Sequence, residues 1–327
     1  MVGFIITFFM ALILAPFFIK IAKKLKFGQN ILGYVSEHAS KQGTPTMGGL
    51  IFILPTIIVS LFFIKGNYQI PALVLAVFLG YSLVGFLDDF IKIKFKRNLG
   101  LHAYQKIIFQ ILIAVIVALF VFKNPNFSTK VIIPFTNLRF ELGWFFIPYI
   151  IIVFLATTNS VNLTDGLDGL AGSTSLVFFV AVTFINVIYT NYFSSLFPQE
   201  YLLQMQNLNT ICLCISGGLL AFLVFNFHPA KIFMGDTGSL ALGGLMSIVC
   251  TLNGLTLFIP IIGFMFVISA TSVIIQVLHF KRTKRRIFLM APFHHHLQLK
   301  GLSEAKISFY YSMITCIIGA LLVISYL

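Results

Sequence analysis

The stretch VGFIITFFMALILAPFFIKIA, residues 2–22, is an apolar run that carries one charged side chain, Lys20. About 20 predominantly apolar residues suffice for a helix to cross the hydrocarbon core of a bilayer. Lys23, Lys24 and Lys26 follow the run at once, and no basic residue precedes it as in a cleavable signal peptide. The stretch therefore predicts a first membrane-spanning helix whose N-terminal end lies outside the cytoplasm.

Composition extends this prediction to the whole chain of 327 residues. Hydrophobic residues make up 59% of it and charged residues only 9%, whereas soluble domains have about 45–50% and about 25%. The net charge of +13 fits basic cytoplasmic loops, so nucleic acid is not an expected partner. The four cysteines lie in apolar segments, which argues against a disulfide framework.

Further apolar runs predict about ten membrane-spanning helices in an all-α, multi-pass fold. Their approximate bounds are 2–22, 47–65, 70–90, 105–122, 144–158, 170–190, 208–226, 238–252, 255–279 and 307–326. The fifth run is short and is able to extend inward toward Asn162, while Asn253 and Gly254 separate the eighth run from the ninth. We expect residues 1–327 to form a single transmembrane catalytic domain.

The basic residues orient these spans. If the loop after the first span is cytoplasmic and the spans alternate, 18 of the 22 Lys and Arg residues lie inside and 4 lie outside. Such an excess marks cytoplasmic loops, so both termini are expected outside. All five Asp and all seven His then lie on the inner side as well. Topology does not require Asp to be sorted in this way, so we predict a binding or catalytic face toward the cytoplasm.

Asp88 and Asp89 end the third predicted span, in GFLDDFIKIKFKRNLGL. Two adjacent carboxylates at a helix C-terminus oppose the helix dipole and repel each other. Mg²⁺, which prefers carboxylate and phosphate oxygens, would neutralise them. The simpler alternative, ion pairs with Lys92 and Lys94, is equally compatible with the sequence.

The run TTNSVNLTDGLDGLAGS carries an amide or carboxylate every three residues, at Asn159, Asn162, Asp165 and Asp168. The glycines between them predict a tight loop in which the backbone approaches a ligand. A cap for the sixth span needs far fewer amides and acids. We therefore interpret this run as a ligand-binding loop.

Two further inner segments carry acids and donors. In FNFHPAKIFMGDTGS, Asp236 begins the eighth span, where it is either an N-cap or a ligand of Mg²⁺ and phosphate. In KRTKRRIFLMAPFHHHLQLKG, the basic run is a cytoplasmic anchor, and the three His residues in a turn present imidazoles to phosphate or metal. Mg²⁺ suits this face better than zinc, because its acids are Asp and no Cys lies nearby.

Two weaker signals complete the pattern. EHASKQGTPTMGGL, residues 37–50, is a basic loop rich in hydroxyl groups, and VIIPFTNLRFEL predicts a small outer hairpin with a turn at Thr136-Asn137. The inner segments together combine carboxylates for Mg²⁺, cations for phosphates and an adjacent lipid phase. This combination predicts phosphoryl transfer from a soluble donor to a lipid acceptor.

The chain resembles the polyprenyl-phosphate N-acetylhexosamine-1-phosphate transferases from about Lys41 to about Gly301. The segments that carry the resemblance are KQGTPTMGG, GFLDDFIK, NLTDGLDGLA, NFHPAKIFMGDTGSLALGG and APFHHHLQLKG. NLTDGLDGLA and FMGDTGS are specific to this superfamily. The HHH run before LKG points to its phospho-N-acetylmuramoyl-pentapeptide transferase branch.

The resemblance implies transfer of phospho-MurNAc-pentapeptide from UDP-MurNAc-pentapeptide to undecaprenyl phosphate in the bacterial cytoplasmic membrane, with release of UMP and a requirement for Mg²⁺. It implies that Asp88, Asp89 and Asp236 are catalytic and that Asp236 and Asp88 bind the metal. Whether one of the adjacent pair is a base or a covalent nucleophile stays open. The implied substrate-binding residues are Lys41, Thr46, Asn162, Leu163, Asp165, Gly166, Asp168, Asn226, Phe233, Gln276, His294, His295 and His296. Members of the family are typically dimers, so a homodimer is implied.

One position departs from the family, which commonly has Glu where this chain has Gln298. The departure puts any acidic role at that position in doubt. A sister enzyme that uses UDP-GlcNAc shares the Asp segments and stays an alternative. A transporter of anionic solutes is the alternative from another class, although transporters often show internal repeats and none is evident here.

Overall fold

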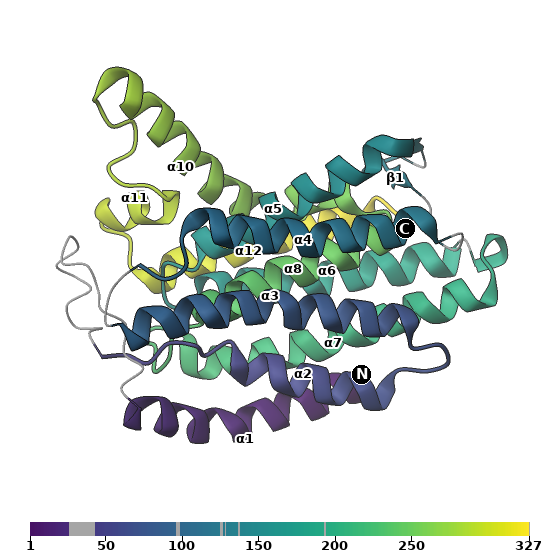
Figure 1. Ribbon diagram of the computed structural model, residues 1–327, viewed down its shortest axis with the longest axis horizontal. Coiled ribbons are helices and arrows are strands. Elements are labelled where there is room, and N and C mark those ends of the chain that lie inside the picture. Colours follow the sequence, from purple (N-terminus) through teal and green to yellow (C-terminus); the bar gives the residue numbers. More distant parts are fainter. Residues whose placement is uncertain are drawn as a thin grey trace.

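The computed structural model describes residues 1–25, 43–95, 99–124, 127, 129–136, 138–192 and 194–326. Helices that run roughly side by side dominate these residues, which confirms the all-α, multi-pass fold (Figure 1). Nine of the described helices have the length and hydropathy of membrane spans. They are α1 (Val2–Lys24), α3 (Gln69–Lys94), α4 (Ala103–Lys123), α5 (Phe146–Thr164), α6 (Leu170–Tyr192), α7 (Gln199–Asn226), α8 (Gly235–Leu252), α10 (Phe264–Thr283) and α12 (Glu304–Ile324).

Two predicted spans differ from the structure. The span predicted at 47–65 forms only α2 (Leu50–Phe63), whose 14 residues extend about 21 Å, short of the ~30 Å hydrocarbon core. The span predicted at 255–279 is interrupted: η4 (Thr256–Phe258) and α9 (Ile259–Ile262) precede α10. Gly263, a poor helix former, lies at the break, and its carbonyl accepts hydrogen bonds from Phe266 and Val267, which start α10.

Other details of the prediction are confirmed. α5 extends past Asn162 to Thr164, and α8 ends at Leu252, just before Asn253 and Gly254. The predicted hairpin consists of β1 (Lys130–Ile132) and β2 (Arg139–Glu141), which are antiparallel with Lys130 opposite Glu141. Asn137 of the predicted turn lies outside the described residues. The short elements that remain are η2 (Gly143–Phe145), η3 (Ser194–Leu196) and α11 (Phe293–Leu299).

Helix α8 forms the centre of the bundle, because 89% of its residues are buried. By contrast, only 28% of the residues in the apolar stretches of α1 and α4 are buried. The outer sides of these two helices are therefore left to face lipid. α10 extends away from the other helices at the upper left of Figure 1. The chain ends carried by α1 and α12 lie toward the right of the figure, at the opposite end from the last turn of α3.

Small residues let α3 and α5 approach α8 closely. A side chain at Gly85 of α3 would collide with the backbone carbonyl of Asp236 in the first turn of α8. On another side of α8, a side chain at Gly243 would collide with the backbone of Thr158 in α5. Membrane helices associate through such close backbone contacts, since lipid provides no hydrophobic drive between them. These contacts therefore determine where the first turn of α8 lies.

We expect Gly85→Ala to lower the thermal stability of the protein in detergent. The added methyl group must displace α8, and overpacking of this kind costs about 1–3 kcal/mol. Gly80→Ala on the same helix is the matched control, because its methyl group would meet only the end of the Ile113 side chain, at 3.3 Å. Equal unfolding temperatures for the two variants would contradict the packing described above.

Candidate active site

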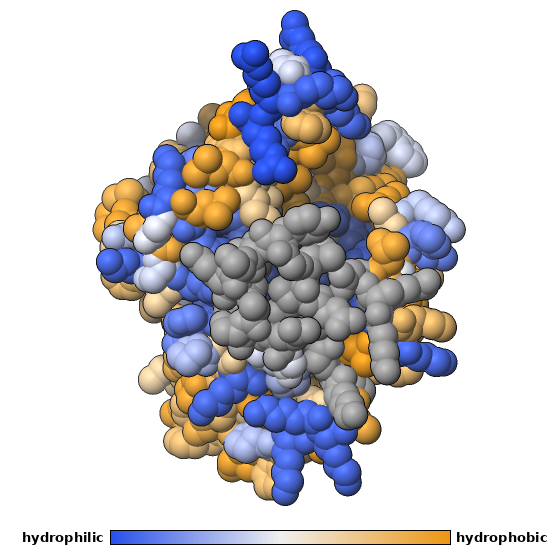
Figure 2. Space-filling model, turned by 90° about the vertical axis from the view of Figure 1, so that its left-hand side faces the viewer, coloured by the Kyte–Doolittle hydropathy of each residue, from blue (hydrophilic) through white to orange (hydrophobic). Residues whose placement is uncertain are grey.

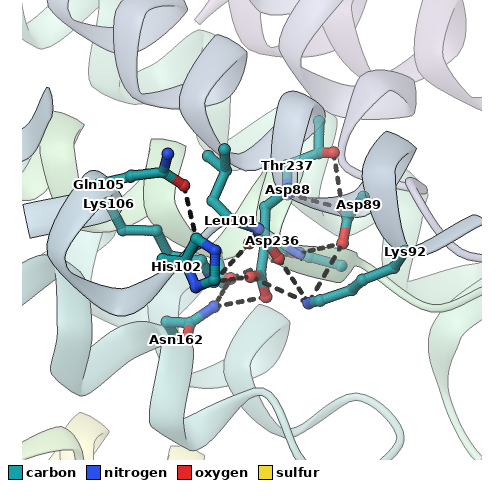
Figure 3. Close-up of polar contacts among 12 residues, drawn as sticks. Asp88, Asp89, Lys92, Leu101, His102, Gln105, Lys106, Asn162, Asp236 and Thr237 are labelled. Atoms are coloured by element: carbon teal, nitrogen blue, oxygen red, sulfur yellow. Dashed lines mark hydrogen bonds and ion pairs between the residues drawn. The ribbon is translucent and has the colours of Figure 1, made fainter. Parts of the chain in front are cut away.

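Four helix ends converge at one end of the bundle. The last turns of α3 and α5 and the first turns of α4 and α8 bring together polar side chains that are far apart in the sequence (Figure 3). The residues that they contribute are Asp88, Asp89 and Lys92 from α3, Lys106 from α4, Asn162 from α5, and Asp236 and Thr237 from α8. Asp88, Asp89 and Asp236, which were predicted to be catalytic, thus lie together in the structure.

Asp89 caps helix α8 from the neighbouring helix α3. Its Oδ2 accepts hydrogen bonds from the backbone N–H of Thr237 at 2.9 Å and from the Thr237 hydroxyl at 2.7 Å. Its Oδ1 accepts one from the backbone N–H of Asp236 at 3.2 Å. The first N–H groups of a helix lack partners within the helix, and a negative charge there is stabilised by the helix dipole. Since Asp89 supplies the cap, Asp236 is not needed as the N-cap that the sequence allowed.

Asp88 and Asp236 instead face two lysine ammonium groups. Lys92 Nζ lies 2.6 Å from Asp88 Oδ2 and 3.2 Å from Asp236 Oδ2. Lys106 Nζ lies 3.0 Å from Asp88 Oδ1 and 2.7 Å from Asp236 Oδ2. The ion-pair alternative from the sequence is therefore confirmed for Lys92. Lys94, in contrast, is exposed, and its ammonium lies 5.9 Å from the centre of the Phe90 ring.

The carboxylates of Asp88, Asp89 and Asp236 have the spacing of a cation site. Each offers one oxygen, and the three oxygens lie within 4.8 Å of one another. Three carboxylates against two ammonium groups leave one negative charge uncompensated, which is costly among membrane helices. Carboxylate oxygens are hard ligands, so the donor set fits Mg²⁺ rather than a metal that prefers sulfur or imidazole.

Asn162 fixes the orientation of Asp236. Its Nδ2 donates to Asp236 Oδ1 at 2.8 Å and to the Ser239 hydroxyl at 2.9 Å. One turn earlier on α5, Asn159 donates to Oε1 of the fully buried Gln110 at 2.8 Å. The amides that recur along this stretch therefore form a polar line between α4, α5 and α8.

The loop after α5 continues this polar line. Burial, together with the negative charges of Asp236 and Asp89, raises the pKa of Asp165 to about 8, and a hydrogen bond from the Gly235 backbone offsets this only in part. Leu163, also predicted for the site, lies half-buried in the last turn of α5.

Asp168 ties this loop to two other parts of the chain. Its Oδ2 accepts from the Ala230 N–H at 3.0 Å and lies 3.1 Å from Nδ1 of His228. Its own backbone N–H donates to Oε2 of Glu304, at the start of α12, at 3.1 Å. One atom each of Asp168, His228 and Glu304 also lies within 4.8 Å of the others, but hydrogen bonds within the protein account for this arrangement.

Asn226 links the loop after α5 to the segment between α7 and α8. Its Oδ1 accepts from the Gly169 N–H at 3.1 Å, and its Nδ2 donates to the Ile232 carbonyl at 2.8 Å. The amide predicted to contact substrate thus holds the loop after α5 against the segment that leads into α8.

The histidine run lies against the loop after α5. His294 is fully buried, and a side chain at Gly166 would collide with its Nε2. Burial, and to a lesser extent the charge of His295, holds the pKa of His294 well below its usual value, so its ring is neutral. Neither ring nitrogen has a hydrogen-bond partner among the described residues. Nδ1 of His295 lies 3.2 Å from Oε1 of Gln298, so an amide oxygen stands where the family commonly has an acid.

Gln276 and His296 stabilise the loop that leads to this run. The Gln276 amide accepts from the N–H groups of Ile287 and Phe288 at 3.0 Å and donates to the Phe288 carbonyl at 3.1 Å. Nδ1 of His296 accepts from the Leu289 N–H at 3.1 Å. Gln276 therefore holds the loop against α10, and His296 holds it against α11.

The segment before α2 reaches the same site. A side chain at Gly235 would come within 2.8 Å of the Thr46 hydroxyl and 2.5 Å of Asp89 Oδ2, so Thr46 lies beside the acidic cluster. The Phe233 backbone pairs with this segment, donating to the Pro45 carbonyl and accepting from the Gly48 N–H, both at 2.8 Å. The half-buried Phe233 ring is partly accessible. Lys41 lies outside the described residues.

Sequence analysis missed Lys106 and Glu304 as site residues. Lys106 lies one turn into the apolar helix α4. A charge in such a position is costly unless it is paired, so its presence there is a signal that the sequence contains. Glu304 begins α12 after a loop, where an acid is an ordinary first-turn residue, so nothing distinguishes it.

Hydrophilic side chains gather on the face that surrounds the site. Figure 2 shows them projecting at its upper and lower margins, where α10 and α1 end. The exposed basic residues there are Lys23 and Lys24 of α1 and Lys281 and Arg282 of α10. Apolar side chains flank this face, so lipid-facing surface lies beside it.

Comparison with known proteins gives two family matches. The profile of "Glycosyl transferase family 4" matches residues 71–254, which include the three clustered aspartates. The "Phospho-N-acetylmuramoyl-pentapeptide-transferase signature 1" matches residues 41–53, which include Thr46 and the start of α2.

Several curated proteins of similar sequence share one name. The phospho-N-acetylmuramoyl-pentapeptide-transferase of Thermoanaerobacter sp. (strain X514) is 43% identical over 96% of this chain and 94% of its own length. Those of Clostridium kluyveri and Oceanobacillus iheyensis are 43% and 44% identical, over 97% and 94% of this chain and 97% and 91% of their own lengths. The chain is therefore a phospho-sugar transferase and belongs to the phospho-N-acetylmuramoyl-pentapeptide-transferase family.

Proposed function

We propose that the chain transfers phospho-MurNAc-pentapeptide from UDP-MurNAc-pentapeptide to undecaprenyl phosphate, with Mg²⁺ and at the cytoplasmic face of a bacterial membrane. An oxygen of the lipid phosphate attacks the phosphorus next to the sugar, and UMP leaves. The clustering of Asp88, Asp89 and Asp236 at one end of the bundle carries this proposal. We further propose that the whole chain is one catalytic domain.

The charge distribution supports the cytoplasmic orientation. Basic residues end α1 and α10 on the same face as the aspartates, and Lys and Arg are enriched in cytoplasmic loops. In this orientation the termini lie outside. The soluble nucleotide donor reaches the site from the cytoplasm, while the lipid phosphate reaches it from the adjacent leaflet.

The proposed roles follow from the contacts of each side chain. Asp236 and Asp88 hold Mg²⁺, which neutralises phosphate charge and polarises phosphate oxygens. Asp89 positions α8, since its oxygens are engaged by the first N–H groups of that helix. Asp88, which does not cap α8, acts either as a base that takes the proton of the lipid phosphate or as a nucleophile that attacks the donor phosphorus, from which the lipid phosphate then displaces it. Lys92 and Lys106 balance negative charge as phosphates bind.

The donor pocket is proposed beside this cluster. The half-buried Asp165 side chain is a polar group for the sugar or nucleotide to contact, and the half-buried Phe233 is a surface for a base to stack on. His294 brings an imidazole to Gly166 in the loop after α5, and the His295 ring lies beside it, with 4.4 Å between the ring centres. Lys41, Thr46, Leu163, Gly166, Asp168 and Asn226 complete the proposed pocket, and a homodimer is proposed as the assembly.

Purified protein in detergent should release UMP from UDP-MurNAc-pentapeptide when undecaprenyl phosphate and Mg²⁺ are present. A chelator should abolish release, and Asp88→Asn should reduce it by at least about 100-fold, the lower range for a catalytic acid or base. Release from UDP-GlcNAc instead would assign the chain to the sister activity. Absence of release with either donor, in folded protein, would refute the proposal.

Asp89→Ala and Asp236→Ala should both abolish UMP release but differ in stability. Each removes one negative charge from the cluster, so the change in charge is matched. Only Asp89→Ala leaves the first N–H groups of α8 without partners, at a cost of about 1–3 kcal/mol. Thermal unfolding in detergent should therefore show the lower midpoint for Asp89→Ala. An equal or lower midpoint for Asp236→Ala would contradict the capping role.

Gln298→Leu should reduce kcat by up to about tenfold, because it removes the acceptor that orients His295, a contact worth about 1 kcal/mol. Gln298→Glu keeps an acceptor of the same size at this position and should retain most of the activity. Steady-state kinetics of UMP release measure both variants. If Gln298→Leu were as active as the parent protein, Gln298 would have no positioning role.

A further inference from the structure

The β1–β2 hairpin lies toward the right of Figure 1, at the end of the bundle opposite to the last turn of α3. Large apolar side chains of the hairpin and of the residues that follow it are exposed. Trp144 and Phe145, which follow the hairpin in η2, are 76% and 77% exposed. The other exposed apolar side chains of this segment are Phe135, Leu138 and Phe140. We call these five residues the aromatic face. Several large apolar side chains left exposed in one short segment mark a site that another phase or partner covers.

The opposite side of the hairpin is held firmly by the protein. Val131 and Ile132 of β1 are buried, and the Ile132 N–H donates to the Gly254 carbonyl at 2.9 Å. The guanidinium of Arg139 lies 5.5 Å from the centre of the Tyr189 ring and 5.7 Å from that of Phe197. These contacts orient the hairpin, so the exposure of the aromatic face results from defined packing.

The lengths of the adjoining helices place this face at a membrane boundary. α5 begins at Phe146 and has 19 residues, which extend about 28 Å and nearly match the ~30 Å hydrocarbon core. Trp144 and Phe145 directly precede it. Trp144 also packs on Phe122 in the last turn of α4, with 4.7 Å between ring centres. The face therefore continues the lipid-facing sides of two spans at the point where both reach the bilayer surface.

We propose that the aromatic face inserts into the headgroup region of the leaflet at this end and anchors the hairpin there. Aromatic side chains, tryptophan above all, favour the membrane interface because one part of the ring system is apolar and another is polar. Lys123, at the end of α4, is exposed close to this face in the sequence and suits the phosphates of lipid headgroups. Lys130, in β1, is a second exposed basic residue there, and its ammonium lies 3.8 Å from the Glu141 carboxylate. A lipid partner explains both the apolar and the basic residues.

The chain contains a single tryptophan, so its fluorescence reports on Trp144 alone. The full chain would be reconstituted in phosphatidylcholine vesicles that carry bromine either near the glycerol or near the ends of the acyl chains. We expect the greatest loss of fluorescence with the shallow bromines and weak quenching by acrylamide in the water. Strong acrylamide quenching without bromolipid quenching would overturn the proposal and leave the face to a soluble protein. Greatest quenching by the deep bromines would overturn it too.

Two variants make the test independent of one position. Trp144→Phe combined with Phe140→Trp moves the reporter onto β2, and shallow quenching is again expected. Trp144→Phe combined with Ile152→Trp is the matched control. Ile152 is 64% exposed on α5, the helix that follows Trp144. It lies about 9 Å further along this helix than Phe146. This control should be quenched most by the deep bromines. A shallow pattern in the control would remove the basis for the assignment.

Discussion

The hydrogen bonds between the Asp89 carboxylate and the first turn of α8 are the interaction on which the site depends. The first N–H groups of a helix have no partners within the helix, and water does not reach the N–H of the fully buried Thr237. Asp89 of α3 supplies the partner, so the contact that caps α8 also holds α3 and α8 together. Because Asp88 precedes Asp89 and Asp236 provides one of the capped N–H groups, the same contact brings the two proposed metal ligands together.

Close packing and charge balance make this arrangement possible. Gly85 lets the backbone of α3 reach the carbonyl of Asp236, which a larger residue would prevent. Lys92 and Lys106 then lie within ion-pair distance of both Asp88 and Asp236. Carboxylates at this depth are tolerated only when cations accompany them. The cluster is nearly neutral yet keeps one negative charge, which favours a cation that arrives with phosphate.

Much of the fold could be predicted from the sequence, because the length of an apolar run indicates whether a helix is able to span the membrane. The acidic face could be predicted as well, because topology does not require Asp residues to lie on one side and their gathering there indicates a site. The break at Gly263 and the shortness of α2 were missed, since apolar runs do not reveal where a helix stops inside the bundle. Lys106 was missed because its partner Asp236 is 130 positions away, so the pair exists only through the packing of α4 beside α3 and α8. The side-chain roles of Asn226 and Gln276 likewise depend on loops whose course the sequence does not show.

The depth of the charged groups bears on the proposed chemistry. A transporter places its charged binding groups near the bilayer midplane, where both sides have alternating access. Here Asp88 and Asp89 lie in the last turns of α3, Asn162 in the last turn of α5, and Asp236 in the first turn of α8. Phosphate remains hydrated at this level, while the hydrocarbon chain of a lipid acceptor stays among the acyl chains. A reaction that joins a soluble nucleotide sugar to a lipid phosphate needs this boundary position, because neither substrate then has to leave its own phase.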